Sequence, residues 1–165
     1  MLLTEAGALH EDAWRHLADD EPVSEKAAIT ISLARWQKDK DALAARSGLL
    51  GLRLPNTVEI ELVAEDLPRF DLIVLDFPKF TDGRAYSQAR LLRQRYHYES
   101  ELRAAGNVLR DQLLFMRRCG FNSFVVGQRA IDENWAEAFT EFDVFYQDAP
   151  DRRPWVMRQR LVKAE

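Results

Sequence analysis

Residues 72–126 read LIVLDFPKFTDGRAYSQARLLRQRYHYESELRAAGNVLRDQLLFMRRCGFNSFVV. Short apolar runs alternate here with longer polar segments rich in helix formers, and turn residues stand at the junctions. The unbroken apolar run at 72–77 is typical of a strand buried on both faces of a parallel sheet. The segment 84–96 that follows carries its apolar residues on one helical stripe. The stretch therefore predicts consecutive strand–helix units of an α/β domain.

The same rhythm continues on both sides of this stretch. Five consecutive βα units predict a mainly parallel sheet with right-handed crossovers and helices packed on it. The pattern is compatible both with an open sheet and with a partial barrel. The predicted strands are 28–33, 49–54, 72–77, 101–105 and 121–126, and the predicted helices are 34–46, 57–66, 84–96, 108–118 and 131–142.

The length of 165 residues suits a single α/β domain that covers the whole chain, 1–165. Residues 1–27 are polar and contain Pro22, so we expect an irregular N-terminal arm with one short strand at most. At the other end, 143–165 holds two apolar clusters divided by the sequence DAPDRRP. This pattern predicts C-terminal segments that pack at the edge of the domain.

The composition excludes several classes of protein. No apolar run approaches the roughly 18 residues of a membrane span, and the first residues carry acids where a secretory signal has bases. We therefore expect a cytoplasmic protein that does not enter a membrane. The single cysteine, Cys119, excludes an internal disulfide and a four-cysteine metal or iron–sulfur site within one chain. The three histidines show no ligand spacing, so no metal site is predicted.

Charge is distributed unevenly along the chain. Residues 1–78 have a net charge of −7, residues 79–118 a net charge of +5 and residues 119–165 a net charge of −2. A basic segment inside an acidic protein favours an anionic small molecule or an acidic partner over nucleic acid, which usually binds to a basic domain. The alternative is that the arginines lie on solvated helix faces and pair with the acidic first half.

Polar residues follow the predicted strands, at the edge of a parallel sheet where ligands bind. Asp76 ends the third strand, and Gly83 and Gly106 lie beside predicted helix N-termini, where free N–H groups favour an anion. The alternative is that glycine, Asp and Asn serve as ordinary helix caps. The residues predicted to bind an anion or ligand are Lys79, Thr81, Gly83, Arg84, Tyr86, Ser87, Arg103, Gly106, Asn107 and Arg110.

The fourth strand, 101–105, places Glu101 and Arg103 on one face. Such charges indicate either an edge strand that faces water or a strand that lines a cavity, where the two groups must be paired or bound to a ligand. In the cavity interpretation Glu101 is the first candidate for an acid/base catalyst, and Asp82 and Asp111 are its competitors. No phosphate loop, dinucleotide fingerprint, zinc-protease motif or nucleophile elbow is present, so the sequence leaves open whether the protein is an enzyme and predicts no particular cofactor.

Part of the chain is similar to a known family. The resemblance is carried by the segments DFPKFTDGRAYSQARLLRQRY at 76–96 and ELRAAGNVLRDQLLFMRRCGFNSF at 101–124. They resemble the signature of an uncharacterised bacterial family, domain of unknown function 934. Members of this family resemble small proteins whose genes often lie beside the gene for assimilatory sulfite reductase, and some of them are labelled as oxidoreductases.

The resemblance implies a pathway and no catalytic residues. Our first hypothesis is an accessory protein of assimilatory sulfite reduction that contacts the reductase or its electron donor and holds an anion in a basic pocket. The alternative is a small enzyme that binds a phosphorylated or flavin-type ligand, for example an oxidoreductase. An exposed sheet edge would permit a homodimer, and nothing in the sequence requires one.

Overall fold

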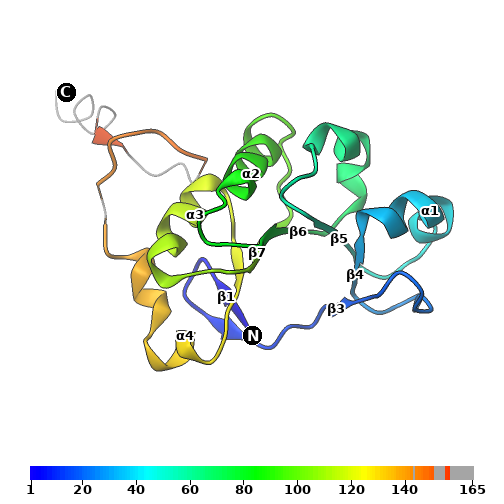
Figure 1. Ribbon diagram of the computed structural model, residues 1–165, viewed down its shortest axis with the longest axis horizontal. Helices are drawn as coiled ribbons and strands as arrows, with labels where there is room; N and C mark the ends of the chain where they lie inside the picture. Colours follow the sequence, from blue (N-terminus) through cyan, green and yellow to red (C-terminus); the bar gives the residue numbers. More distant parts are fainter. Residues whose placement is uncertain (143, 151–154, 157–165) are drawn as a thin grey trace.

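The computed structural model describes residues 1–142, 144–150 and 155–156. Within them a mostly parallel sheet curls as in part of a barrel, in the order β2-β1-β8-β7-β6-β5-β4-β3 (Figure 1). Strands β3 to β8 pair in parallel, whereas β1 and β2 pair antiparallel at one edge. The strands are β1 Leu2–Thr4, β2 Leu9–His10, β3 Arg15–His16, β4 Ile29–Ser32, β5 Leu50–Leu54, β6 Leu72–Phe77, β7 Glu101–Gly106 and β8 Ser123–Val125.

The five strands predicted from the sequence correspond to β4 through β8, which confirms the α/β class and the mainly parallel sheet. The count of five units is not confirmed, because the N-terminal arm supplies β1, β2 and β3. The expectation of at most one strand within 1–27 is therefore wrong. These strands are two or three residues long and show no periodicity of their own. They form because an edge strand offers unpaired backbone groups: β1 pairs with β8, β3 with β4, and β2 with β1.

The helical segments also follow the prediction, with shifted ends. The segment expected at 57–66 is a 3-10 helix that ends just after Pro68. The helix expected at 131–142 is divided in two, because Asn134 has a left-handed backbone with φ of 47°. The helices are α1 Leu33–Ala44, η1 Ile60–Arg69, α2 Arg84–Gln94, η2 Arg110–Gln112, α3 Leu113–Cys119, α4 Arg129–Asp132 and η3 Trp135–Phe139.

The main core lies between the sheet and the helices on its convex side. Helices α1, α2 and α3 lie along this side in Figure 1. Leu52, Ile73 and Leu102 project from neighbouring strands into this core and are fully buried. Trp36 of α1 packs edge-on against Phe70, with ring centroids 4.9 Å apart. Burial of these apolar faces is the main force that holds the helices on the sheet.

The concave side of the sheet is covered by the N-terminal arm, which passes along it between β2 and β3 (Figure 1). Trp14 of this arm packs against a second apolar cluster made by Leu72, Val74 and Ala105. The arm therefore covers part of the concave surface, which in a complete barrel would face the interior.

The predicted C-terminal edge segments fall largely outside the described residues. In the described part of these segments, Phe145 and Trp155 form an isolated parallel bridge. In the part of the chain that the structure describes, no helix combines the length and the apolar character needed to cross a membrane.

Candidate functional site

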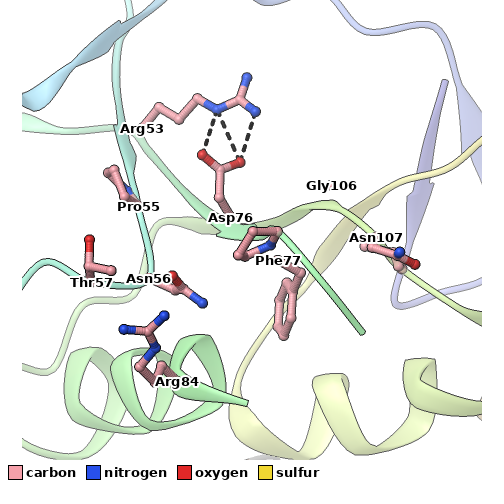
Figure 2. Close-up of a pocket in the computed structure, with 11 residues that line it drawn as sticks. Arg53, Pro55, Asn56, Thr57, Asp76, Phe77, Arg84, Gly106 and Asn107 are labelled. Carbon is pink, nitrogen blue, oxygen red and sulfur yellow. Dashed lines mark hydrogen bonds and ion pairs between the residues drawn. The ribbon is translucent and has the colours of Figure 1, made fainter. Parts of the chain in front are cut away.

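A cleft of about 860 Å³ opens at the carboxyl ends of β5, β6 and β7 (Figure 2). Its size is in the range of small-molecule sites, and its place is the one where parallel α/β sheets bind their ligands. The lining residues come from the ends of three strands, from the loops that follow them and from the start of α2. They are Arg53, Pro55, Asn56, Thr57, Asp76, Phe77, Pro78, Arg84, Gly106, Asn107 and Val108.

Gly106 determines how β6 and β7 end at the cleft. Its φ of +93° is unfavourable for any residue with a side chain, and a Cβ atom there would lie 2.4 Å from the carbonyl oxygen of Phe77. The next residue, Asn107, donates its backbone N–H to that same oxygen at 2.8 Å. The chain thus turns away directly after β7, and the next helix, η2, begins only at Arg110. The prediction that Gly106 lies beside a helix N-terminus is therefore wrong, and this glycine contributes to the cleft through its backbone conformation.

An ion pair between Arg53 and Asp76 joins the ends of β5 and β6. The Arg53 Nη2 and Nε atoms donate to the two Asp76 carboxylate oxygens at 2.8 and 2.9 Å, and Figure 2 shows the side chains facing each other. The side chains remain 39% and 25% exposed. The hydrogen bonds from Arg53 to Asp76 raise the pKa of the guanidinium, which stays charged.

A second pair lies between the loop after β6 and the first residue of α2. Arg84 donates from Nε and Nη2 to the Asp82 carboxylate at 2.9 and 2.6 Å. These hydrogen bonds, together with the nearby Asn56 amide and the backbone N–H of Arg84, hold the pKa of Asp82 well below its ordinary range. The Arg84 side chain is 58% exposed, so a cation is held in place while still open to solvent.

Asn56 is the anomaly of the cleft. It is only 6% exposed, and its Nδ2 atom is buried without a hydrogen bond of normal length and angle to any described residue. The Asp82 carboxylate is nevertheless close enough for the Asn56 amide to lower its pKa as a hydrogen-bond donor, although the contact falls short of normal length and angle. A buried donor without a partner costs about 1–3 kcal/mol and is uncommon in native proteins. The arrangement suits a ligand that brings an acceptor oxygen to this atom.

The structure brings only part of the predicted site together. Arg84, Gly106 and Asn107 line the cleft, and Asp82 is bound to Arg84 beside it. The loop residues Lys79, Thr81 and Gly83 and the helix residue Ser87 are exposed and do not line it.

Two further predicted residues have partners away from the cleft. Tyr86 is half-buried between the rings of Phe77 and Phe115, at 5.0 and 4.9 Å, and burial raises the pKa of its phenol to about 12. Arg110 forms an ion pair with Glu141 at 2.6 Å.

Glu101 and Arg103 belong to another cluster on the concave face. Arg103 is 3% exposed and donates to Glu101 at 2.7 Å, to Asp12 of the N-terminal arm at 3.0 Å and to Ser123 at 3.4 Å. The Ser123 hydroxyl also donates to Glu101 at 2.6 Å. Strand β7 lies between β6 and β8, so the edge-strand interpretation of these charges is wrong. The two charges are paired with each other, and Asp12 of the arm completes the cluster. This arrangement favours a structural role for both residues.

Arg53 and Asn56 were missed among the predicted site residues, and Asp76 was noted only for its position. The signal was present, because Arg53 is a charge inside the apolar run LGLRL and Asn56 stands two residues after that strand ends. The rule that directed attention to the residues after the third and fourth strands applies equally to the second.

The described residues contain no group of three or more His, Cys, Asp or Glu side chains that could hold a metal ion. Fold and cleft together define a curled α/β protein with a pocket at the carboxyl ends of its parallel strands. The chain belongs to the bacterial family of unknown function DUF934, whose model matches residues 51–156. This match confirms the resemblance, and it includes every residue that lines the cleft. A search of curated proteins finds no significant match.

Proposed function

We propose that this protein binds an anionic small molecule in the cleft, with oxygen atoms of the ligand at Asn56 and Arg84. The observation that carries the proposal is the buried Asn56 Nδ2 atom, which lies near the Asp82 carboxylate but lacks an acceptor at normal hydrogen-bond length and angle among the described residues. A phosphate, sulfate or sulfite oxygen would provide one. In the view of Figure 2, the Asn56 amide lies on the same side of the cleft as the Arg84 guanidinium.

Arg84 supports the proposal through its geometry. Asp82 accepts from Nε and Nη2, and no hydrogen bond from Nη1 to a described residue is formed. An anion can therefore bind to Nη1 by a charge-assisted hydrogen bond without breaking the existing pair. Because Asp82 fixes the guanidinium, little side-chain entropy is lost on binding.

For the biological role, we propose an accessory protein of assimilatory sulfite reduction that contacts the reductase or its electron donor. The support for the pathway is the family resemblance alone. Sulfite and sulfate fit the chemistry of the cleft because they are small oxyanions. The alternative proposal is an enzyme that binds a phosphorylated or flavin-type ligand in the same place.

Calorimetric titration with sulfite, sulfate and inorganic phosphate tests the binding proposal. At least one of the anions should bind to the wild type, and Asn56→Leu and Arg84→Ala should each weaken it about tenfold or more. Arg90→Ala is the matched control, because Arg90 is an exposed arginine of the same helix outside the cleft. Unchanged affinity in both cleft variants would overturn the proposal.

Growth of a deletion strain tests the pathway. Failure on sulfate and sulfite, with rescue by sulfide, would support a role at sulfite reduction. Restoration of growth by the wild-type gene but not by the Asn56→Leu gene would connect that role to the cleft. Normal growth of a strain without a second copy on all three sulfur sources would contradict the pathway.

A further inference from the structure

A second hollow of about 470 Å³ adjoins the cleft and shares Arg53, Pro55 and Asp76 with it. It lies at the carboxyl ends of β3, β4 and β5, so the two spaces together extend along this end of the sheet from β3 to β7. The Arg53–Asp76 pair stands where they meet. The other residues that line the second hollow are His16, Asp19, Ser32, Leu33, Ala34, Gln37 and Val58.

The second hollow differs from the cleft in chemistry. Leu33 and Ala34, at the start of α1, and Pro55 and Val58, after β5, give it apolar walls. Several of its polar groups already have partners within the protein. The Ser32 hydroxyl donates to Asp19 at 2.6 Å and accepts from the backbone of α1. The hollow therefore offers an apolar slot, whereas the cleft offers a cation and an unpaired donor.

Asp76 lies between these two environments with hydrogen-bonding capacity to spare. A carboxylate has about four acceptor positions, and the fork of Arg53 occupies one side of it. Nucleotide-binding α/β proteins use an acidic side chain at such a place to accept hydrogen bonds from ribose hydroxyls. Along this end of the sheet, the anion site at Asn56 and Arg84 is thus followed by Asp76, which can accept hydrogen bonds from hydroxyl groups, and then by the apolar hollow.

We infer that the ligand is a mononucleotide. Its phosphate binds to Asn56 and Arg84, its sugar hydroxyls donate to Asp76, and its flat ring occupies the hollow beside Leu33, Ala34 and Val58. The inference rests on the proposed anion site and adds the class of molecule that carries the anion. It favours the enzyme or cofactor-binding alternative over binding of a free inorganic oxyanion.

The test compares probes that contain successive parts of the ligand: inorganic phosphate, ribose 5-phosphate, AMP and FMN. Titration of the wild type should show that AMP or FMN binds at least tenfold more tightly than ribose 5-phosphate. Ala34→Trp should remove this advantage by filling the hollow and should leave the affinity for ribose 5-phosphate unchanged. Ala42→Trp is the control, since Ala42 is an exposed alanine of the same helix outside both spaces.

Two negative results have different meanings. If ribose 5-phosphate binds as tightly as both nucleotides, the hollow takes no ring and the inference is overturned, while the anion site stands. If no anion in either titration series binds, the proposed function fails and the inference fails with it. An advantage of the nucleotides that survives in Ala34→Trp also contradicts the inference, because the ring would then lie elsewhere.

Discussion

Two arginines stand in the same row of the sheet and have opposite surroundings. Arg53 is paired in register with Val74, and Val74 with Arg103, so the two guanidinium groups leave the same face two strands apart. Arg103 reaches back to Glu101 at the amino end of its strand. Arg53 reaches forward to Asp76, towards the carboxyl end.

The difference lies in how completely each cation is satisfied. Arg103 is buried and bound by Glu101 and by Asp12 of the arm, so it has no room for a ligand. Arg53 is partly exposed, has one carboxylate partner and borders both the cleft and the second hollow. A cation closed off by two carboxylates stabilises the fold, whereas one left at a pocket wall is available for binding. The following predictions test this division of roles.

The largest effect is expected from Arg103→Leu. It leaves the Glu101 and Asp12 carboxylates without their shared cation and should lower the free energy of unfolding by about 3 kcal/mol, the low end for a broken buried pair because both acids keep some contact with water. Urea denaturation measures the change. Affinity for the anion that binds to the wild type should stay within about twofold where the variant is folded. Loss of binding without loss of stability would reverse the assignment.

The next effect concerns the backbone at the cleft. Gly106→Ala forces a Cβ atom into the left-handed conformation and against the Phe77 carbonyl, which should cost about 2 kcal/mol and also weaken anion binding. Gly127→Ala is the matched control, since its Cβ would meet no atom within 4 Å, and it should change stability by less than about 0.5 kcal/mol. Equal effects at the two glycines, by urea denaturation, would contradict the close approach of β6 and β7.

A smaller effect is expected at the Arg53–Asp76 pair. Because both side chains keep contact with water, a double-mutant cycle of Arg53→Ala and Asp76→Ala should give a coupling free energy of about 1 kcal/mol or less. The single variants should instead weaken binding of AMP or FMN. A coupling free energy of about 3 kcal/mol, as large as the loss of stability expected for Arg103→Leu, would show that the two arginines do not differ in role.

The smallest effect is a pH dependence of stability that arises at Tyr98, close to the Glu101–Arg103 pair. Burial raises the pKa of Tyr98, whose hydroxyl donates to the carbonyls of Phe70 and Glu101. The folded state therefore keeps the phenol proton where the unfolded chain loses it, so this contribution is complete below about pH 10 and declines as the pH rises further. The urea midpoint of the wild type should fall more between pH 8 and pH 11 than that of Tyr98→Phe. An equal fall of the urea midpoint in the wild type and in Tyr98→Phe would contradict the prediction.

The sequence alone determined the strands β4 to β8, because their apolar runs are long enough to show a pattern and turn residues bound them. It also pointed to the correct edge of the sheet, since polar residues at the carboxyl ends of parallel strands converge there. Arg84, Gly106 and Asn107 were found in this way.

Tertiary structure decided what the charges do. Asp12 lies 91 residues before Arg103, and no local pattern shows that the arm crosses the concave face to bind it. The three N-terminal strands are too short to have a periodicity, so they exist only because neighbouring edges pair with them. The lack of a normal hydrogen bond at the Asn56 amide likewise results from how the folded chain buries this side chain. Local sequence governs where strands and turns occur, whereas the saturation of a polar group depends on residues that meet only when the sheet curls.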